Sequence, residues 1–158
     1  MKTQCSHDVT MPARLEGLAL EQALATADKT CAEFSEWLTP PRRRVLKLLL
    51  MAGTPSKAYD LIGAYQGDGR AVSPTTVYRA LEFLEGMGFV HRLESINAYI
   101  ACRAERRGHA AAFLLCKCCG GAEEFEPDLR SERAAATTAG FKINRVTLEA
   151  QGVCRNCR

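Results

Sequence analysis

The placement of the cysteines constrains this chain more strongly than any other feature of its sequence. Eight cysteines occur in 158 residues, and four of them form two C-x-x-C pairs separated by thirty-four residues. In a reducing compartment this spacing favours four thiolates around one metal ion over two disulfide bonds. Each pair can direct two sulfur atoms at one ion about 2.3 Å away, and two pairs complete a tetrahedron around zinc. The expected ligands of this structural zinc are Cys116, Cys119, Cys154 and Cys157.

A redox-active dithiol is the alternative interpretation of these pairs. A redox C-x-x-C should open a helix, whose dipole lowers the thiol pKa, whereas Cys116 follows a predicted strand over 110–116. Gly120 and Gly121 follow the first pair and Gly152 precedes the second, and such glycines allow the tight turns of a zinc knuckle. The context therefore favours a metal site.

Three further residues could in principle bind metal, but the sequence gives less support for each. Cys118 lies inside the first pair, so its combination with Cys116 or with Cys119 is a formal rival as a ligand pair. The two-residue gap suits one ion better, and we expect Cys118 to be a free, oxidisable thiol. Cys5 and His7 lie in an expected N-terminal tail, where an incidental role is expected rather than ligation.

Composition and charge narrow the class of protein. The chain is 47% hydrophobic and 25% charged, as soluble globular proteins are, and no apolar run approaches the ~18 residues that a membrane span requires. The N-terminal residues lack the apolar region of a signal peptide, so we expect a cytoplasmic protein. The net charge is only +3, but residues 40–79 hold seven basic and two acidic residues, a local excess of +5. A basic half-surface of this kind suits phosphate contact.

Helical periodicity organises the first half of the chain. Apolar residues from Leu20 to Leu38 recur at spacings of four and three, which predicts one amphipathic helix. Thr39 is the expected N-cap of a second helix, whose apolar residues between 45 and 51 should all be deeply buried. Ser56 is expected to cap a third helix, and Ser73 followed by proline is the strongest helix start in the chain.

Two short strands follow the fourth predicted helix, over 89–93 and 98–102. Helices followed by a two-stranded hairpin predict a winged helix-turn-helix. A charged, aperiodic segment over 104–108 is the expected hinge to a smaller unit, with strands over 110–116, 122–125 and 141–148 and a helix over 128–138. Such a unit has a thin core, and zinc binding contributes on the order of 10 kcal/mol of folding free energy in small zinc peptides.

A second set of potential metal ligands comes from both sides of this hinge. His91 and Cys102 belong to the two strands of the wing, His109 follows the hinge, and Glu124 lies in a later strand. Each is unremarkable alone, but together they offer two nitrogens, one sulfur and one oxygen, a set suited to zinc. Glu123 is the most plausible substitute for Glu124.

Several motifs, in this order and spacing, resemble those of the ferric uptake regulator family. They are Leu38–Arg42 (LTPPR), Ala58–Leu61 (AYDL), Thr76–Leu81 (TVYRAL), Gly88–His91 (GFVH) and the two C-x-x-C pairs. The resemblance covers roughly Leu20 to Cys157. Within the family the chain is similar to the zinc uptake regulator branch, because 108–116 holds a single histidine where iron sensors usually carry a cluster.

The resemblance implies a fold, a partner and a set of site residues. The implied fold is α+β, with an expected tail over 1–14, a winged-helix DNA-binding domain over 15–103, a hinge over 104–108 and a zinc-containing dimerisation domain over 109–158. It maps the family's sensory zinc onto His91, Cys102, His109 and Glu124, which gives two zinc ions per chain. The residues expected to contact DNA are Tyr59, Thr76, Arg79, Arg42 and Arg43, with Arg44 and Lys57 as further candidates for phosphate contact.

The function that this combination favours is a zinc-responsive transcriptional repressor that binds operator DNA as a metal-loaded homodimer and controls zinc-uptake genes. A sensor of iron, manganese or peroxide is the alternative within the family, although the soft thiolate ligand favours zinc. A thiol redox protein and a zinc-ribbon interaction module are the alternatives of other classes, and the latter leaves the basic segment unexplained. No nucleophile–base pair or paired acids at a convincing spacing support an enzyme, and no membrane or small-molecule substrate is expected.

Overall fold

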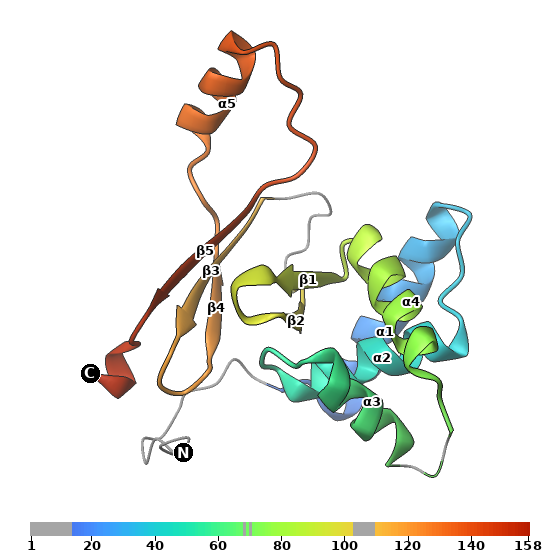
Figure 1. Ribbon diagram of the computed structural model, residues 1–158. Helices are drawn as coiled ribbons and strands as arrows, with labels where there is room; N and C mark the ends of the chain where they lie inside the picture. Colours follow the sequence, from blue (N-terminus) through green and yellow to red (C-terminus); the bar gives the residue numbers. More distant parts are fainter. Residues whose placement is uncertain (1–13, 68, 70, 103–109) are drawn as a thin grey trace. The chain divides into compact units, whose positions relative to one another are not determined.

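The computed structural model describes residues 14–67, 69, 71–102 and 110–158 (Figure 1). These residues form two compact units, one within Thr10–Arg107 and the other within Gly108–Arg158. The expected tail, except for Arg14, and the expected hinge lie outside the described residues. Among the helices that the structure describes, none combines the length and hydrophobicity that a bilayer crossing requires.

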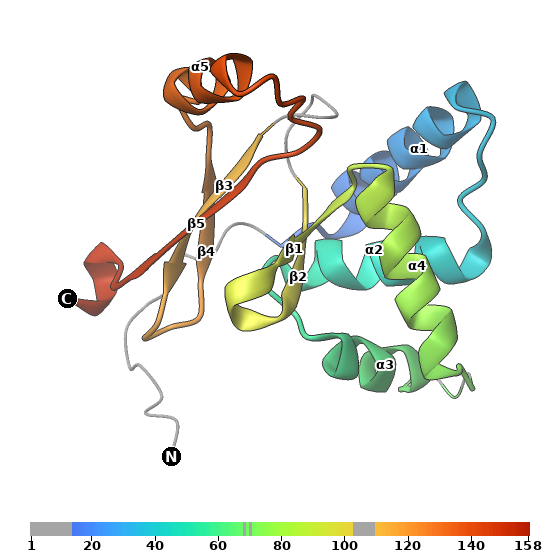
Figure 2. The same cartoon turned by 45° about the horizontal axis from the view of Figure 1, so that its top comes forward.

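The first unit is a winged helix, as predicted. Four helices precede a two-stranded antiparallel hairpin, and α4 lies beside α2 in both ribbon views (Figure 1, Figure 2). The elements are α1 (Gly17–Glu33), α2 (Pro40–Ala52), α3 (Ala58–Gln66), α4 (Pro74–Gly86), β1 (Val90–Leu93) and β2 (Ala98–Ala101).

Helical periodicity explains the core of this unit. Val77, Leu81 and Leu84 face inward from α4 as expected, and Val45 and Leu49 of α2 meet them in one cluster. Burial of each such side chain stabilises the fold by roughly 1.5–3 kcal/mol. In contrast with the prediction, Leu48 is half-buried and Met51 is exposed. A continuous apolar run cannot be buried completely, because a period of 3.6 residues turns part of it toward solvent.

Helix termini follow the predicted signals in two of three cases. Ser73 is the N-cap of α4, and its hydroxyl oxygen accepts a hydrogen bond from the backbone N–H of Thr76 at 3.3 Å. Thr39 is the N-cap of α2, without a side-chain capping bond. The expected cap Ser56 is wrong: Lys57 occupies that position, and Ser56 instead exchanges two 2.8 Å backbone hydrogen bonds with Tyr99 of the wing. This bridge is a non-local pairing that local capping preferences do not reveal.

The first helix is shorter than its apolar spacing predicted. It ends at Glu33, and Ser35 adopts a left-handed conformation with φ of 57°. The N–H groups of Ser35 and Glu36 donate to the carbonyls of Ala32 and Cys31, which is the Schellman arrangement of a helix end. The chain therefore leaves the helix before Leu38, the last residue of the predicted stripe.

The second unit is a three-stranded sheet with a crossover helix. Its strand order is β4-β3-β5, where β3 pairs antiparallel with β4 and parallel with β5. The elements are β3 (Ala111–Cys116), β4 (Ala122–Phe125), α5 (Arg130–Thr138) and β5 (Thr147–Gly152). The strand expected over 141–148 is wrong in its bounds, because the sequence alternation there does not reveal where pairing with β3 begins. That pairing runs from Thr147 opposite Ala111 to Gly152 opposite Cys116.

Candidate metal centre and nucleic-acid interface

The parallel register of β3 and β5 brings the two C-x-x-C pairs together. Cys116 is the last residue of β3 and lies opposite Gly152, the last residue of β5. The backbone N–H of Lys117 donates to the carbonyl of Gly152 at 2.9 Å, which extends the pairing beyond the strands. Both pairs therefore lie at the same end of the sheet.

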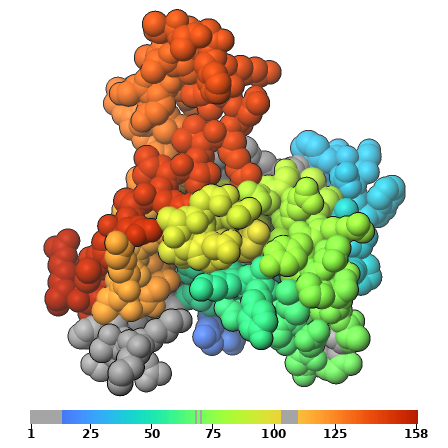
Figure 3. Space-filling model, in the orientation of Figure 1, coloured from blue at the N-terminus to red at the C-terminus, as the bar shows by residue number. Residues whose placement is uncertain are grey.

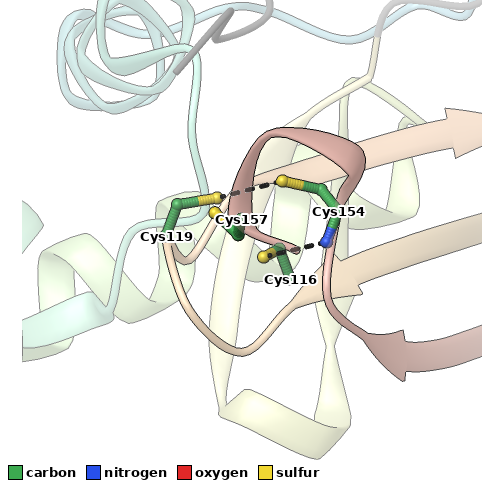
Figure 4. A group of neighbouring side chains, drawn as sticks. All are labelled: Cys116, Cys119, Cys154 and Cys157. Atoms are coloured by element: carbon green, nitrogen blue, oxygen red, sulfur yellow. Dashed lines mark hydrogen bonds between the residues drawn. The ribbon is translucent and has the colours of Figure 1, made fainter. Parts of the chain in front are cut away.

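The four sulfur atoms form a cluster with the dimensions of a zinc site. All four Sγ atoms lie within 4.8 Å of one another, and those of Cys119 and Cys154 are 4.0 Å apart (Figure 4). A tetrahedron with Zn–S distances of 2.3 Å requires sulfur atoms about 3.8 Å apart. Cys116 and Cys157 complete the group. The donor set and its spacing thus fit one tetrahedral zinc ion.

Backbone turns shape the cluster. Gly120 has φ of 73°, a conformation that favours glycine, and its N–H donates to the carbonyl of Cys116 at 2.9 Å. The N–H of Cys154 donates to the Sγ of Cys116 at 3.3 Å, and the N–H of Cys157 donates to the carbonyl of Cys154. Gly152, expected in a turn, lies instead in β5.

The thiols differ in their protonation because their surroundings differ. Backbone N–H groups, foremost that of Cys119 and then that of Cys154, lower the pKa of Cys116 to about 6. Burial and the neighbouring thiols raise the pKa of Cys157 to about 12, and burial also raises the pKa of Cys119. Four thiolates at this spacing repel one another, and a divalent cation removes that repulsion.

Cys118, expected to be a free thiol, takes part in a disulfide bond in the structure. That expectation is therefore wrong: a free or bridged state depends on which cysteine the fold brings within reach, and spacing inside a knuckle does not show this. Cys5 and His7 lie outside the described residues.

The expected regulatory ligands are divided between the two units. In the first unit His91 of β1 is buried, and a ring nitrogen of His91 lies within 4.8 Å of the Sγ of Cys102, directly after β2. In the second unit Glu124 of β4 is half-buried, whereas its neighbour Glu123 is exposed. His109 lies outside the described residues. The structure thus shows an imidazole and a thiol brought together within the wing.

The residues expected to read DNA lie at the start of α3 and on α4. Tyr59 is 81% exposed, and Arg79 is also exposed, while Thr76 is half-buried in the first turn of α4. The wing, in yellow, forms one continuous surface with the yellow-green residues of α4 (Figure 3). Tyr78, next to Arg79 on α4, is also largely exposed.

The two arginines expected to contact phosphate make intramolecular contacts. Arg43 forms an ion pair with Asp28, and its Nη2 atom lies 3.5 Å from Oε2 of Glu21; both acids are on α1. Arg42 donates to the carbonyl of Trp37 and lies over the ring of Phe83, contacts that nothing in the sequence indicated. Of the further candidates, Lys57 is exposed, and Arg44 is half-buried with its guanidinium 6.0 Å from the ring of Tyr65.

A winged helix in the same chain as a four-cysteine zinc-type cluster defines the class of metal-binding winged-helix proteins. The family model of the ferric uptake regulator family matches residues 36–151, and the chain belongs to this family of transcription regulators. The chain is 34% identical over 146 residues to the zinc uptake regulation protein of Escherichia coli K12, covering 90% of this chain and 85% of that protein.

Solved structures agree with this relationship. A zinc uptake regulator complexed with zinc and DNA superposes with a TM-score of 0.83 at 34% identity, over 89% of this chain and 96% of that chain. The crystal structure of holo XcZur superposes with a TM-score of 0.78 at 41% identity, over 86% and 96% of the two chains. The α+β fold and the family resemblance expected from the sequence are therefore confirmed.

Proposed function

We propose that this protein is a zinc-responsive transcriptional repressor that binds operator DNA as a homodimer and controls zinc-uptake genes. The observation that carries the proposal is the four-cysteine cluster in a chain that also presents an exposed recognition helix. The similarity to zinc uptake regulators, one of them in complex with zinc and DNA, supports the same conclusion. A protein that acts on operator DNA works in the cytoplasm.

The DNA-binding surface is proposed to centre on α4 and the start of α3. The guanidinium of Arg79 can donate two parallel hydrogen bonds to O6 and N7 of guanine, and Thr76 can contact phosphate near the helix N-terminus. Tyr59 can pack its exposed ring against the duplex. Lys57 supplies a nonspecific charge, whereas Arg43 is held by two acids of α1 and contributes less than expected from its charge.

Two zinc ions per chain are proposed. Cys116, Cys119, Cys154 and Cys157 would hold the structural ion, which in this position cross-links β3 to the segment after β5. His91, Cys102, His109 and Glu124 would hold the regulatory ion. The ligand chemistry and the family resemblance support this second set, together with the closeness of His91 and Cys102 in the wing.

The regulatory set suggests how zinc controls DNA binding. Its ligands come from both sides of the hinge, so a shared ion would restrain the angle between the two units. The recognition helices of a symmetric dimer must enter major grooves about 34 Å apart, and a free hinge spreads them over other separations. A tenfold gain in operator affinity requires only ~1.4 kcal/mol of differential zinc affinity.

Metal analysis of the purified protein before and after mild chelation, with operator binding measured in parallel, tests the proposal. We expect two zinc ions per chain, of which one is removed easily together with operator binding. A protein that binds the operator equally well after losing this ion contradicts zinc response. Restoration of operator binding by iron or manganese but not by zinc would favour the alternative sensor within the family.

A further inference from the structure

The loop between α1 and α2 displays two aromatic side chains on the surface of the winged helix. Trp37 is 74% exposed, and Phe34 is also largely exposed. Nevertheless the backbone of the loop is held at both ends, which calls for an explanation.

The first end is fixed by the hydrogen bonds that close α1. Glu36 donates to the carbonyl of Cys31 at 2.9 Å, and Ser35 donates to that of Ala32 at 3.0 Å. These bonds require Ser35 to remain in its left-handed conformation. The direction in which the loop leaves α1 is therefore set.

The second end is fixed by Arg42, in the first turn of α2. Its Nη1 donates to the carbonyl oxygen of Trp37 at 2.7 Å and lies 3.7 Å from a carboxylate oxygen of Glu36. The Cζ atom of the same guanidinium lies 3.3 Å from the centre of the Phe83 ring of α4, which is a cation–π contact. One side chain thus joins the loop, α2 and the recognition helix.

The position of Phe83 gives this contact a functional meaning. Phe83 follows Arg79 by four residues, so it lies about 6 Å further along α4 on the same side of the helix. A restraint at Phe83 therefore acts one helical turn from the residue proposed to read bases. An arginine that contacts phosphate must direct its donors into solvent, whereas only 28% of the Arg42 side chain is exposed.

We propose that Arg42 is a positioning residue, which fixes the α1–α2 loop and α4 relative to each other and does not contact phosphate. This inference rests on the proposed function in one respect only, namely that α4 reads operator DNA. The arginine of the LTPPR motif would then hold the recognition helix in place, and it would not add to the positive charge that the DNA-binding face presents to phosphate.

Two properties separate a positioning role from a phosphate contact. Loss of a phosphate contact lowers the slope of log affinity against log salt concentration by about 0.9, whereas loss of a positioning contact leaves it unchanged. The second property is the mobility of the loop. Trp37 is the single tryptophan of the chain, so its fluorescence anisotropy and its quenching by iodide report on this loop alone.

The experiment compares Arg42→Gln, Arg42→Lys, Phe83→Leu and Lys57→Gln in the full-length, zinc-loaded protein. For Arg42→Gln we expect two- to fivefold weaker operator binding, roughly the equivalent of one exposed cation–π contact, with an unchanged salt slope and a more mobile Trp37. Phe83→Leu, which keeps the charge, should reproduce both effects, and Arg42→Lys should restore part of each. Lys57→Gln removes an exposed charge at the start of α3, away from the α1–α2 loop in sequence, and should lower the salt slope without altering Trp37.

A salt slope that falls by about 0.9 in Arg42→Gln, with Trp37 as immobile as in the wild type, would overturn the proposal in favour of a phosphate contact. Unaltered Trp37 mobility in both Arg42→Gln and Phe83→Leu would overturn it as well. If the wild type shows no zinc-dependent operator binding, the proposed function fails by itself. The fluorescence of the DNA-free variants then still decides whether Arg42 holds the loop.

Discussion

Ser35 shows at the scale of one residue how the end of a helix is specified. A non-glycine side chain in the left-handed region costs roughly 1–2 kcal/mol. Ser35 adopts this conformation because its N–H and that of Glu36 then donate hydrogen bonds to the last carbonyl oxygens of α1. Glycine would occupy the same position without the steric cost.

Ser35→Gly is therefore expected to stabilise the protein by about 0.5–1 kcal/mol, because relief of the left-handed strain exceeds the added entropy of the unfolded chain. Urea denaturation of the wild type and the variant measures the difference. Ser35→Ala keeps the Cβ atom and removes only the hydroxyl, so it should give no such gain. Equal stabilities for the glycine variant and the wild type would show that the conformation is unstrained.

Arg79→Ala is expected to cost about 1–3 kcal/mol of specific operator binding and to leave the zinc content unchanged, because Arg79 is an exposed residue of α4 and no proposed zinc ligand lies on that helix. Competition assays with operator and random DNA measure the loss. Arg79→Lys retains the charge without the two-pronged donor, so it should keep nonspecific binding and lose discrimination. An equal loss of affinity for operator and random DNA would show that Arg79 contacts phosphate and does not read bases.

At the scale of elements, the three-stranded sheet and the cysteine cluster depend on each other. The parallel pairing of β3 with β5 places Cys154 beside Cys116, and a zinc ion bound there would tie the end of β5 to the turn after β3. The edge strands bury little surface, so metal binding would supply folding free energy that the small core lacks.

Cys119→Ser is accordingly expected to release the structural zinc, unfold the second unit and abolish the dimer. Zinc content, hydrogen exchange of the β3 amides and sedimentation check these three effects. Cys102→Ser is the matched control, since it should keep the structural ion and lose only the regulatory one. A Cys119→Ser protein that stays a folded dimer without metal would refute the structural role of the cluster.

At the scale of the whole molecule, the proposed regulatory site links zinc binding to operator binding. His109→Ala is expected to keep the structural zinc and the dimer but to lose the zinc dependence of operator binding. His7→Ala, at another of the three histidines of the chain, should leave that dependence intact. An undiminished zinc response in the His109 variant would require the shared regulatory site to be abandoned.

Thermodynamic linkage adds a second expectation at this scale. If zinc tightens operator binding by a given factor, operator DNA must tighten zinc binding by the same factor. Zinc titrations with and without operator DNA measure the factor by which the operator tightens zinc binding. A zinc affinity that operator DNA leaves unchanged would show that zinc binding and operator binding are not coupled.

The sequence by itself determined the features that depend on neighbouring residues. Two C-x-x-C pairs predicted a four-thiolate cluster because each pair forms its own turn, and Ser73 with Pro74 predicted the start of α4 because capping involves only the first helical turn. The winged helix followed from periodicity within each element, which requires no knowledge of the partner surface.

Only the tertiary structure decided the features that depend on residues far apart in the chain. The start of β5 follows from its register with β3, the disulfide of Cys118 contradicts the free thiol expected from spacing, and the contact of Arg42 with Phe83 joins α2 to α4. The physical reason is the same in each case. A local pattern records which conformations a segment prefers, whereas strand register, disulfide pairing and the partner of a charge depend on which distant surface folding brings within a few ångströms.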